Sequence, residues 1–224
     1  SEEPDTVAAE IIAQIIINNP NAVLGLATGS TPINIYKKLI DMKLDWSNIT
    51  TFNLDEYVGL TQDHPQSYYF FMWQNLFQHT NIKKENINFL SGTAENINDE
   101  VKRYENLIKT HPIDLQLLGV GTNGHIAFNE PGSPKTSLSR KICLTEQTIK
   151  DNSRFFDKQE QQPTEALTMG IQTILSAKQV LLVAKGVQKT AAIKRALFGG
   201  INEDCPASYL QEHQQCVFIV DNEV

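Results

Sequence analysis

The chain has few cysteines, only Cys143, Cys205 and Cys216 among 224 residues. An odd number at scattered positions cannot form a complete disulfide framework, which excludes the small disulfide-stabilised secreted domains. Because unpaired thiols are typical of a reducing compartment, we expect a cytoplasmic protein.

Basic residues are also scarce, with 19 Lys and Arg against 26 Asp and Glu and a formal net charge of −7. This excess of acid disfavours an extended nucleic-acid-binding surface, so no nucleic-acid partner is expected. An anionic ligand would have to be held by a few well-placed cations and backbone N–H groups.

Membrane and metal patterns are missing as well. The apolar stretch at residues 11–17 is interrupted by Gln14 and is too short to span a membrane, so no membrane association is expected. The five histidines form neither an H-x-x-x-H pattern nor a cluster with cysteines, so no metal site is expected.

What the chain does have is an alternation of short apolar segments with segments of helical periodicity. Five segments rich in Leu and β-branched residues are expected to be buried strands, at residues 23–27, 49–54, 115–120, 179–184 and 216–220. The alternation predicts a single α/β domain over residues 1–224, with an open, mostly parallel sheet and helices on both faces in a Rossmann-like three-layer arrangement. Because ligands bind such sheets at the carboxyl ends of the strands, the loops that follow the strands are the candidate site.

The loop after the first expected strand contains Thr28, Gly29, Ser30, Thr31 and Pro32. Gly29 lets the backbone approach a ligand, Thr31 can cap the following helix, and Pro32 suits its first turn. Hydroxyl groups and the N–H groups of a helix N-terminus would form an anion site. An ordinary capped turn is an equally good interpretation of this loop alone.

Two acids, Asp55 and Glu56, follow the second expected strand. Adjacent side chains of an extended segment point to opposite faces, so only one of the two can enter a given cleft. A carboxylate at the carboxyl end of a strand is well placed to act as a general base. A solvated acidic pair is the competing interpretation.

A glycine-rich segment, GVGTNGHIAFNEPG at residues 119–132, follows the third expected strand. Its beginning matches the dinucleotide-binding pattern G-x-G-x-x-G, but the PGSP residues that come later prevent the helix that such a site requires. What remains is a polar group of side chains, Asn123, His125, Asn129 and Glu130. Since a histidine can carry a proton either way near neutral pH and a carboxylate can fix its tautomer, we expect acid–base chemistry here.

Two basic residues are candidates for binding an anion. Lys189 lies in the loop after the fourth expected strand, near a helix start, and Arg154 lies in the segment NSRFFD. Taken singly, each could equally be an ordinary surface residue.

Read together, these segments resemble the glucosamine-6-phosphate deaminase family, and in particular its shorter members. The matching segments, in the family's order, are LGLATGSTP, FNLDEYVGL, HPQSYYFFM, LLGVGTNGHIAFNEPGS, NSRFFD and ALTMGIQTIL. The combination of DEYVGL with GHIAFNEPG is specific to this family, whereas related sugar-phosphate enzymes share TGSTP.

The resemblance implies hydrolytic deamination of glucosamine 6-phosphate to fructose 6-phosphate and ammonia, without a metal or an organic cofactor. It implies that His125, supported by Glu130 and Asn123, opens the sugar ring. It implies that Asp55 then moves the C2 proton to C1, so that water can hydrolyse the resulting imine. The implied phosphate-binding residues are Thr28, Gly29, Ser30, Thr31, Arg154 and Lys189.

This chain departs from part of the family in ways that change the expectation. Some relatives have Asp where this chain has Asn123, and because an amide cannot exchange a proton, His125 and Glu130 must carry the acid–base work. Hexameric assembly and allosteric activation belong to longer relatives, so we expect a monomer or a small homo-oligomer that binds a small sugar phosphate. The segment at about residues 136–163 is a candidate lid.

Two alternative functions remain open. A hydrolase similar to 6-phosphogluconolactonase would share the fold and loops, but it needs no carbonyl-forming isomerisation, so Asp55 would have no role as a C2 base. A non-catalytic sugar-phosphate-binding module would not require Asp55, His125 and Glu130 together.

Overall fold

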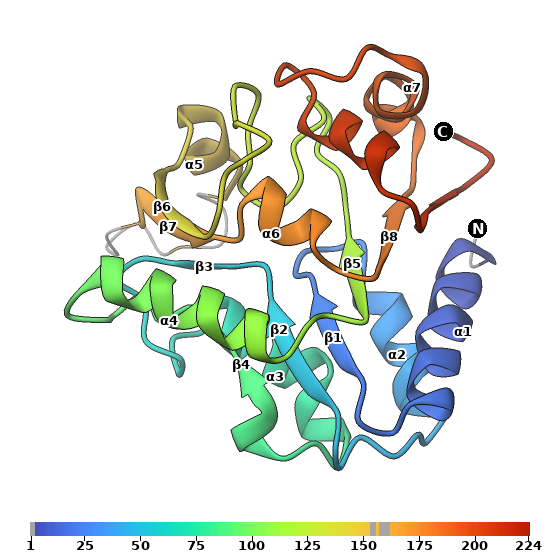
Figure 1. Cartoon of the computed structure of the whole chain (residues 1–224), viewed down its shortest axis with the longest axis vertical. Coiled ribbons are helices and arrows are strands. Elements are labelled where there is room, and N and C mark those ends of the chain that lie inside the picture. Colours follow the sequence, from blue (N-terminus) through green and yellow to red (C-terminus); the bar gives the residue numbers. More distant parts are fainter. Residues whose placement is uncertain (1–2, 153–155, 157–161) are drawn as a thin grey trace.

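A parallel sheet forms the centre of the structure, a computed structural model that describes residues 3–152, 156 and 162–224. Its strands are β1 (Val23–Leu26), β2 (Thr50–Asn53), β4 (Ile87–Asn88), β5 (Leu115–Leu118), β8 (Gln179–Ala184) and β9 (Cys216–Val220). They lie in the order β4-β2-β1-β5-β8-β9, and each neighbouring pair is parallel (Figure 1).

The prediction of an open parallel α/β sheet is confirmed. All five expected strands form, β8 and β9 with the predicted bounds and the other three slightly shorter. β4 has only two residues, too few to produce a pattern that the sequence would reveal.

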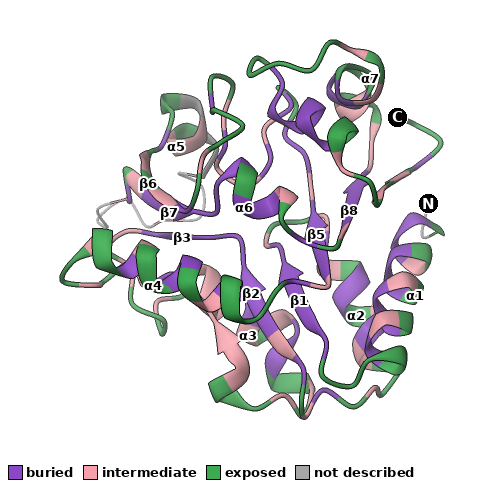
Figure 2. Ribbon diagram, viewed as in Figure 1, coloured by how far each residue is buried: buried purple, intermediate pink, exposed green. Residues whose placement is uncertain are grey.

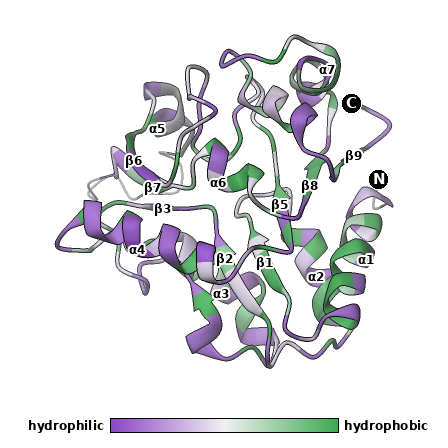
Figure 3. Cartoon of the chain, viewed as in Figure 1, coloured by the Kyte–Doolittle hydropathy of each residue, from purple (hydrophilic) through white to green (hydrophobic). Residues whose placement is uncertain are grey.

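Helices cover both faces of the sheet, as predicted. The helices on one face are α1 (Glu3–Asn18), α2 (Ile33–Asp41) and α3 (Tyr68–Asn75), and those on the other are α4 (Ile97–Thr110), α6 (Ile171–Leu175) and α7 (Thr190–Phe198). The strand residues alternate between these faces. Leu24 packs in the apolar cluster that includes α1, α2 and α3, called here the first cluster, and Val23 packs in the cluster that includes α4, α6 and α7. The central strands β1 and β5 are buried along their length, and β8 is buried after its first residue, whereas the outer strands β4 and β9 are only partly buried (Figures 2 and 3).

A second, antiparallel sheet lies beside the carboxyl end of β2. It consists of β3 (Asp55–Tyr57), β7 (Glu165–Thr168) and β6 (Arg140–Cys143) in the order β3-β7-β6, and α5 (Glu146–Asn152) follows β6. The sequence did not predict this sheet, because its strands are short and lack continuous apolar runs. It includes part of the candidate lid at about residues 136–163. Residues 153–155 and 157–161 of that segment lie outside the described residues, and the lid stays a prediction.

The strand order creates a crevice between β1 and β5. From β1 the chain proceeds to β2 and β4 on one side, and then returns through α4 to β5 on the other side. The loops after β1 and β5 therefore diverge, which is the arrangement that binds ligands in open α/β sheets. In Figure 1 these strands run upward, and the chain after β5 continues between α5 and α7.

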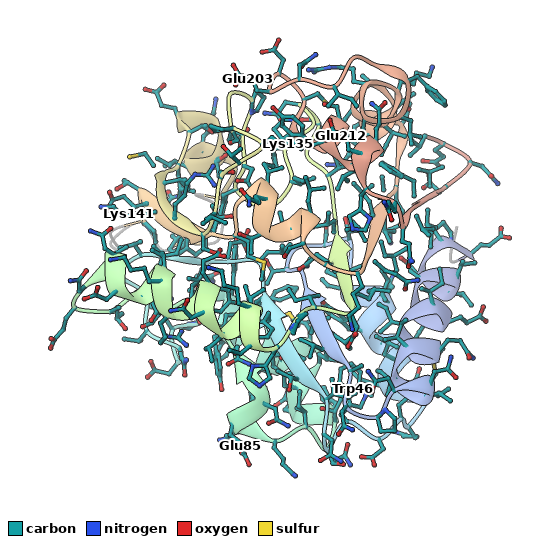
Figure 4. All side chains as sticks on the ribbon, in the orientation of Figure 1. Trp46, Glu85, Lys135, Lys141, Glu203 and Glu212 are labelled. Carbon is teal, nitrogen blue, oxygen red and sulfur yellow. The ribbon has the colours of Figure 1, made fainter. Side chains whose placement is uncertain are left out.

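One exposed ion pair connects the glycine-rich loop to a segment near the C-terminus. Lys135, just after the glycine-rich segment, forms an ion pair with Glu212 of the 3-10 helix Pro206–Glu212 (Figure 4). At the opposite end of the sheet Trp46 is buried in the first apolar cluster. No helix among the described residues has both the length and the apolar character needed to cross a membrane.

Close backbone packing against β3 can be tested at Gly92. A Cβ atom there would lie 1.9 Å from the carbonyl oxygen of Tyr57. Gly92→Ala must therefore displace the backbone and should destabilise the fold by roughly 1–3 kcal/mol, measured as a lower Tm. Gly200→Ala is the matched control, since its nearest neighbour would be 3.7 Å away. Equal melting temperatures for the two variants would contradict this packing.

Candidate active site

A cleft of about 390 Å³ opens at the carboxyl ends of β1, β2, β5 and β8. It brings together predicted site residues from four separate loops: Thr28, Gly29, Ser30, Thr31, Asp55, His125 and Lys189. The crevice predicted from the strand order is therefore where these residues meet.

The loop after β1 leaves backbone donors free at the cleft. Gly29 has a φ of +94°, a left-handed conformation that only glycine adopts without strain. Pro32 occupies the N-cap position of α2 in a helical conformation, and no side chain among the described residues caps this helix. The prediction that Thr31 caps α2 was wrong, because the helical turn already begins at Pro32. The uncapped N–H groups favour an anion here.

Lys189 supplies a cation beside this loop. It ends the 3-10 turn Val187–Lys189 before α7, and burial lowers the pKa of its ammonium group. The start of this turn is held by Asp221, whose two carboxylate oxygens accept a hydrogen bond from the N–H of Gly186 at 3.2 and 3.0 Å. Among the described residues no carboxylate pairs with Lys189, so its charge is available to an anion. Arg154 lies outside the described residues.

Asp55 and Glu56 point in different directions, as predicted for adjacent residues of an extended strand. Asp55 lines the cleft with 7% of its surface exposed, and no group in the described part of the chain donates a hydrogen bond to it. Burial, followed by the negative charge of Glu56, raises the pKa of the Asp55 carboxyl to about 8. A carboxyl group of this kind can exchange a proton near neutral pH.

Asn123, His125 and Glu130 form a hydrogen-bonded triangle at the edge of the cleft. The Asn123 Oδ1 atom lies 2.8 Å from His125 Nδ1, Glu130 Oε1 lies 3.4 Å from the same nitrogen, and Asn123 Nδ2 donates to Glu130 Oε2 at 2.7 Å. Since both neighbours of Nδ1 are acceptors, the proton resides on Nδ1, and Nε2 is left as the basic nitrogen.

The surroundings of Glu130 lower its pKa, whereas those of Asp55 raise the pKa of that carboxyl. Burial alone would raise the pKa of Glu130, but hydrogen bonds from His125 and Asn123 and the charge of His125 hold it below its ordinary value. Glu130 is therefore a carboxylate that orients His125, whereas Asp55 is a carboxyl group able to exchange its proton.

Glycines of this loop make room for the histidine ring. A Cβ atom at Gly121 would lie 2.2 Å from His125 Nδ1, so the ring packs directly on the backbone of residue 121. Ala127, in the cleft wall, has a φ of +50°, a strained conformation for a residue other than glycine. The loop is thus shaped around His125.

Asn129 belongs to the support of the loop and not to the cleft. It is fully buried, and its Nδ2 donates to the carbonyls of Ile126 at 3.0 Å and Met169 at 2.8 Å. Its Oδ1 accepts a hydrogen bond from Arg140 Nη1 at 2.8 Å. Of the polar residues expected from the sequence, Asn123, His125 and Glu130 therefore lie together at the cleft, whereas Asn129 stabilises the loop.

Two aromatic residues of the cleft were missed by the sequence analysis. Tyr68 and Phe128 line it, with ring centroids 6.0 Å apart and planes inclined by 11°. Tyr68 comes from the start of α3, and no local pattern indicates that this helix faces the cleft. Among the described residues no group of three His, Cys, Asp or Glu side chains could hold a metal ion.

The fold and the cleft define an α/β protein with an acid–base site for a small anionic ligand. The chain belongs to the family described as glucosamine-6-phosphate isomerases/6-phosphogluconolactonase, whose model matches residues 5–219. The family resemblance found in the sequence is confirmed.

The curated relatives reported for this chain carry the deaminase name. Glucosamine-6-phosphate deaminase from Thermoanaerobacter pseudethanolicus is 48% identical over 99% of this chain and 90% of its own length. The protein of the same name from Clostridium botulinum strain Loch Maree is 49% identical over 99% of this chain and 93% of its own length.

Solved structures of a deaminase and of a 6-phosphogluconolactonase match this chain, at different levels of similarity. A structure described as a monomeric glucosamine-6-phosphate deaminase matches with a TM-score of 0.95 and 45% identity, over 99% of this chain and 94% of that one. The 6-phosphogluconolactonase from Thermotoga maritima matches with a TM-score of 0.78 and 21% identity, over 98% and 95%. The second match reflects the shared fold alone.

The raised pKa of Asp55 predicts a pH-dependent penalty on stability. The carboxyl holds its proton more tightly in the folded chain, with a pKa of about 8, than at its ordinary value of 3.8. Its contribution to folding stability therefore falls as pH rises between these values. Asp55→Asn, which cannot ionise, should melt several °C above the wild type at pH 8 and closer to it at pH 5.

The matched control is Asp41→Asn, an exposed position at the end of α2. Its melting temperature should differ from the wild type by the same amount at both pH values. A constant difference for Asp55→Asn as well would show that Asp55 is ionised in the folded protein throughout this range.

Proposed function

We propose that this protein converts glucosamine 6-phosphate and water to fructose 6-phosphate and ammonia, and is a hydrolase in this sense. The observation that carries the proposal is the meeting of Asp55 and His125 in one cleft with Lys189 and the loop after β1. The deaminase predicted from the sequence is confirmed by the curated relatives of that name and by the matching solved structure.

His125 performs the first step, the opening of the sugar ring. Its Nε2 takes the proton of the C1 hydroxyl and returns a proton to the ring oxygen, which creates the carbonyl group that acidifies the C2 hydrogen. Glu130 and Asn123 hold the Nδ1–H and keep the ring in this tautomer. Asn123 only orients, because an amide does not exchange protons.

Asp55 performs the second step, the transfer of the C2 proton to C1. The substrate itself promotes ionisation of Asp55, because a cationic amino group at C2 beside the buried carboxyl lowers the pKa of that carboxyl. Loss of the C2 proton and its delivery to C1 leave an imine at C2, which water hydrolyses to the ketose and ammonia. A lactone would offer Asp55 no cationic amino group, and its hydrolysis requires no transfer of the C2 proton.

The phosphate group is held by the loop Thr28, Gly29, Ser30 and Thr31 together with Lys189. This assignment is supported by the N–H groups at the start of α2 and by the ammonium of Lys189, which pairs with no carboxylate in the described part of the chain. We assign Arg154 to the phosphate as well, on the family resemblance of its segment. The segment at about residues 136–163 is proposed as the lid over the bound sugar.

The deciding assay incubates purified protein with glucosamine 6-phosphate and measures ammonia and fructose 6-phosphate. Formation of both in equal amounts is expected. Hydrolysis of 6-phosphogluconolactone without release of ammonia would identify a lactonase. Binding of the sugar phosphate without either reaction would identify a binding module.

The role of Asp55 as the base predicts that its replacement stops proton exchange at C2. Asp55→Asn should abolish the exchange of the C2 hydrogen with solvent deuterium, because the amide cannot accept that proton. The Kd for glucosamine 6-phosphate should stay within a few-fold of the wild-type value, measured by calorimetry. Exchange at the wild-type rate would show that another residue is the base.

The role of Lys189 predicts an effect on substrate binding. Lys189→Ala should raise KM by about tenfold or more, since a lost charge-assisted contact to phosphate is worth roughly 1.5–3 kcal/mol. The effect on kcat should be smaller, because a remote contact binds substrate and transition state alike. Lys194→Ala, an exposed position on α7, the helix that follows Lys189, is the control. An unchanged KM in Lys189→Ala would remove this residue from the site.

Assembly and compartment complete the proposal. We propose a monomer or a small homo-oligomer, supported by the similarity to a deaminase described as monomeric. We propose a cytoplasmic location, supported by the three cysteines, all of which are free thiols.

A further inference from the structure

Glu56 is a buried carboxylate that the reaction itself does not use. It is 3% exposed and lies next to Asp55 on β3, a strand that Figure 2 shows buried along its length. Its side chain points away from the cleft. Burying a carboxylate is unfavourable unless its oxygens are paired, so its position calls for a physical reason.

Three backbone N–H groups bind this carboxylate. Glu56 Oε1 accepts hydrogen bonds from the N–H groups of Tyr57 and Tyr68, and Oε2 accepts one from the N–H of Tyr69, each at 2.9 Å. Tyr68 and Tyr69 are the first two residues of α3. Glu56 therefore connects the strand that carries Asp55 to the N-terminus of a helix.

The next donor of α3 is satisfied separately. Ser67, the N-cap residue, accepts the N–H of Phe70 through its Oγ at 3.0 Å. The first turn of α3 thus uses two side chains, one charged and one neutral. The positive end of the helix dipole favours the charged one.

The connection determines where Tyr68 stands relative to Asp55. Tyr68 lines the cleft together with Asp55, donates a hydrogen bond to the Tyr57 hydroxyl at 3.2 Å and stacks on Phe128. Because Glu56 binds the N–H of Tyr68 itself, a shift of α3 against β3 would move this aromatic wall away from Asp55.

Glu56 also sets the charge behind Asp55. The titratable groups around it are Asp55, Tyr57, Tyr68, Tyr69 and His64. Burial raises the pKa of Glu56 to about 7, while the three N–H groups and the charge of His64 act against that rise. Its negative charge is the second cause, after burial, of the raised pKa of Asp55.

We propose that Glu56 is a positioning residue for the base: its carboxylate fixes α3 and Tyr68 against β3 and places a negative charge directly behind Asp55. The proposal rests on the proposed function only in that Asp55 is the base. Glu56 touches no substrate and acts entirely through its neighbours.

Glu56→Gln tests this role, because glutamine keeps the shape but loses the charge and turns one oxygen into a donor facing a backbone N–H. We expect kcat to fall at least tenfold, with KM within about threefold. We expect the acid limb of the kcat/KM profile to move to lower pH by about one unit, since the charge that keeps Asp55 protonated is gone.

Ser67→Ala is the matched control, since it removes a neutral acceptor from the same helix end. It should lower Tm, as loss of a cap does, and leave the acid limb in place. An acid limb that moves equally in both variants, or in neither, would overturn the proposal. If Glu56→Gln does not fold, Glu56→Asp decides, because it keeps the charge but shortens the reach. In that variant kcat should fall at least fivefold, and an unchanged kcat would overturn the positioning role.

Carbon-13 NMR of labelled aspartate carboxyls separates this proposal from the proposed function. The pKa of Asp55, assigned by its absence in Asp55→Asn, should fall in Glu56→Gln and stay constant in Ser67→Ala. This readout does not depend on turnover. A wild-type protein that releases no ammonia, with Asp55 still shifting in Glu56→Gln, would remove the proposed function and leave the link between Glu56 and Asp55 intact.

Discussion

Parallel pairing of β1 with β2 on one side and with β5 on the other determines where the cleft can form. Leu24 is in register with Thr51 of β2 and with Leu115 of β5. The carboxyl ends of three strands therefore lie at one edge of the sheet, and the loops after them converge although they are far apart along the chain. The rest of the site, including the cation at Lys189, is arranged around this edge.

The two carboxyl groups at the cleft, Asp55 and Glu130, have pKa values shifted in opposite directions. Burial, followed by the charge of Glu56, raises the pKa of Asp55, while hydrogen bonds from His125 and Asn123 hold the pKa of Glu130 below its ordinary value. Two such environments suit two different tasks, one of proton exchange and one of orientation. The arrangement opposes stability, because the same burial that prepares Asp55 as a base penalises its ionised form.

The sequence predicted the main sheet well, because buried parallel strands are continuous apolar runs that need no partner to be recognised. It did not predict β3, β6 and β7, whose short strands are defined by their pairing and not by their composition. The predicted cap at Thr31 was wrong for a related reason, since the backbone angles of Pro32 decide where α2 begins. Tyr68 was missed because its place depends on how α3 packs against β3.

By itself the sequence determined the order of strands and helices and the kinds of side chain that follow each strand. It also contained the segments that place the chain in its family, because family motifs are local. Only the tertiary structure decided that Asp55, and not Glu56, faces the cleft, that oxygen atoms of Asn123 and Glu130 face Nδ1 of His125, and that Asn129 is structural. Burial, hydrogen-bond partners and pKa values depend on groups that lie close in space but far apart along the chain, and a local pattern does not contain those distances.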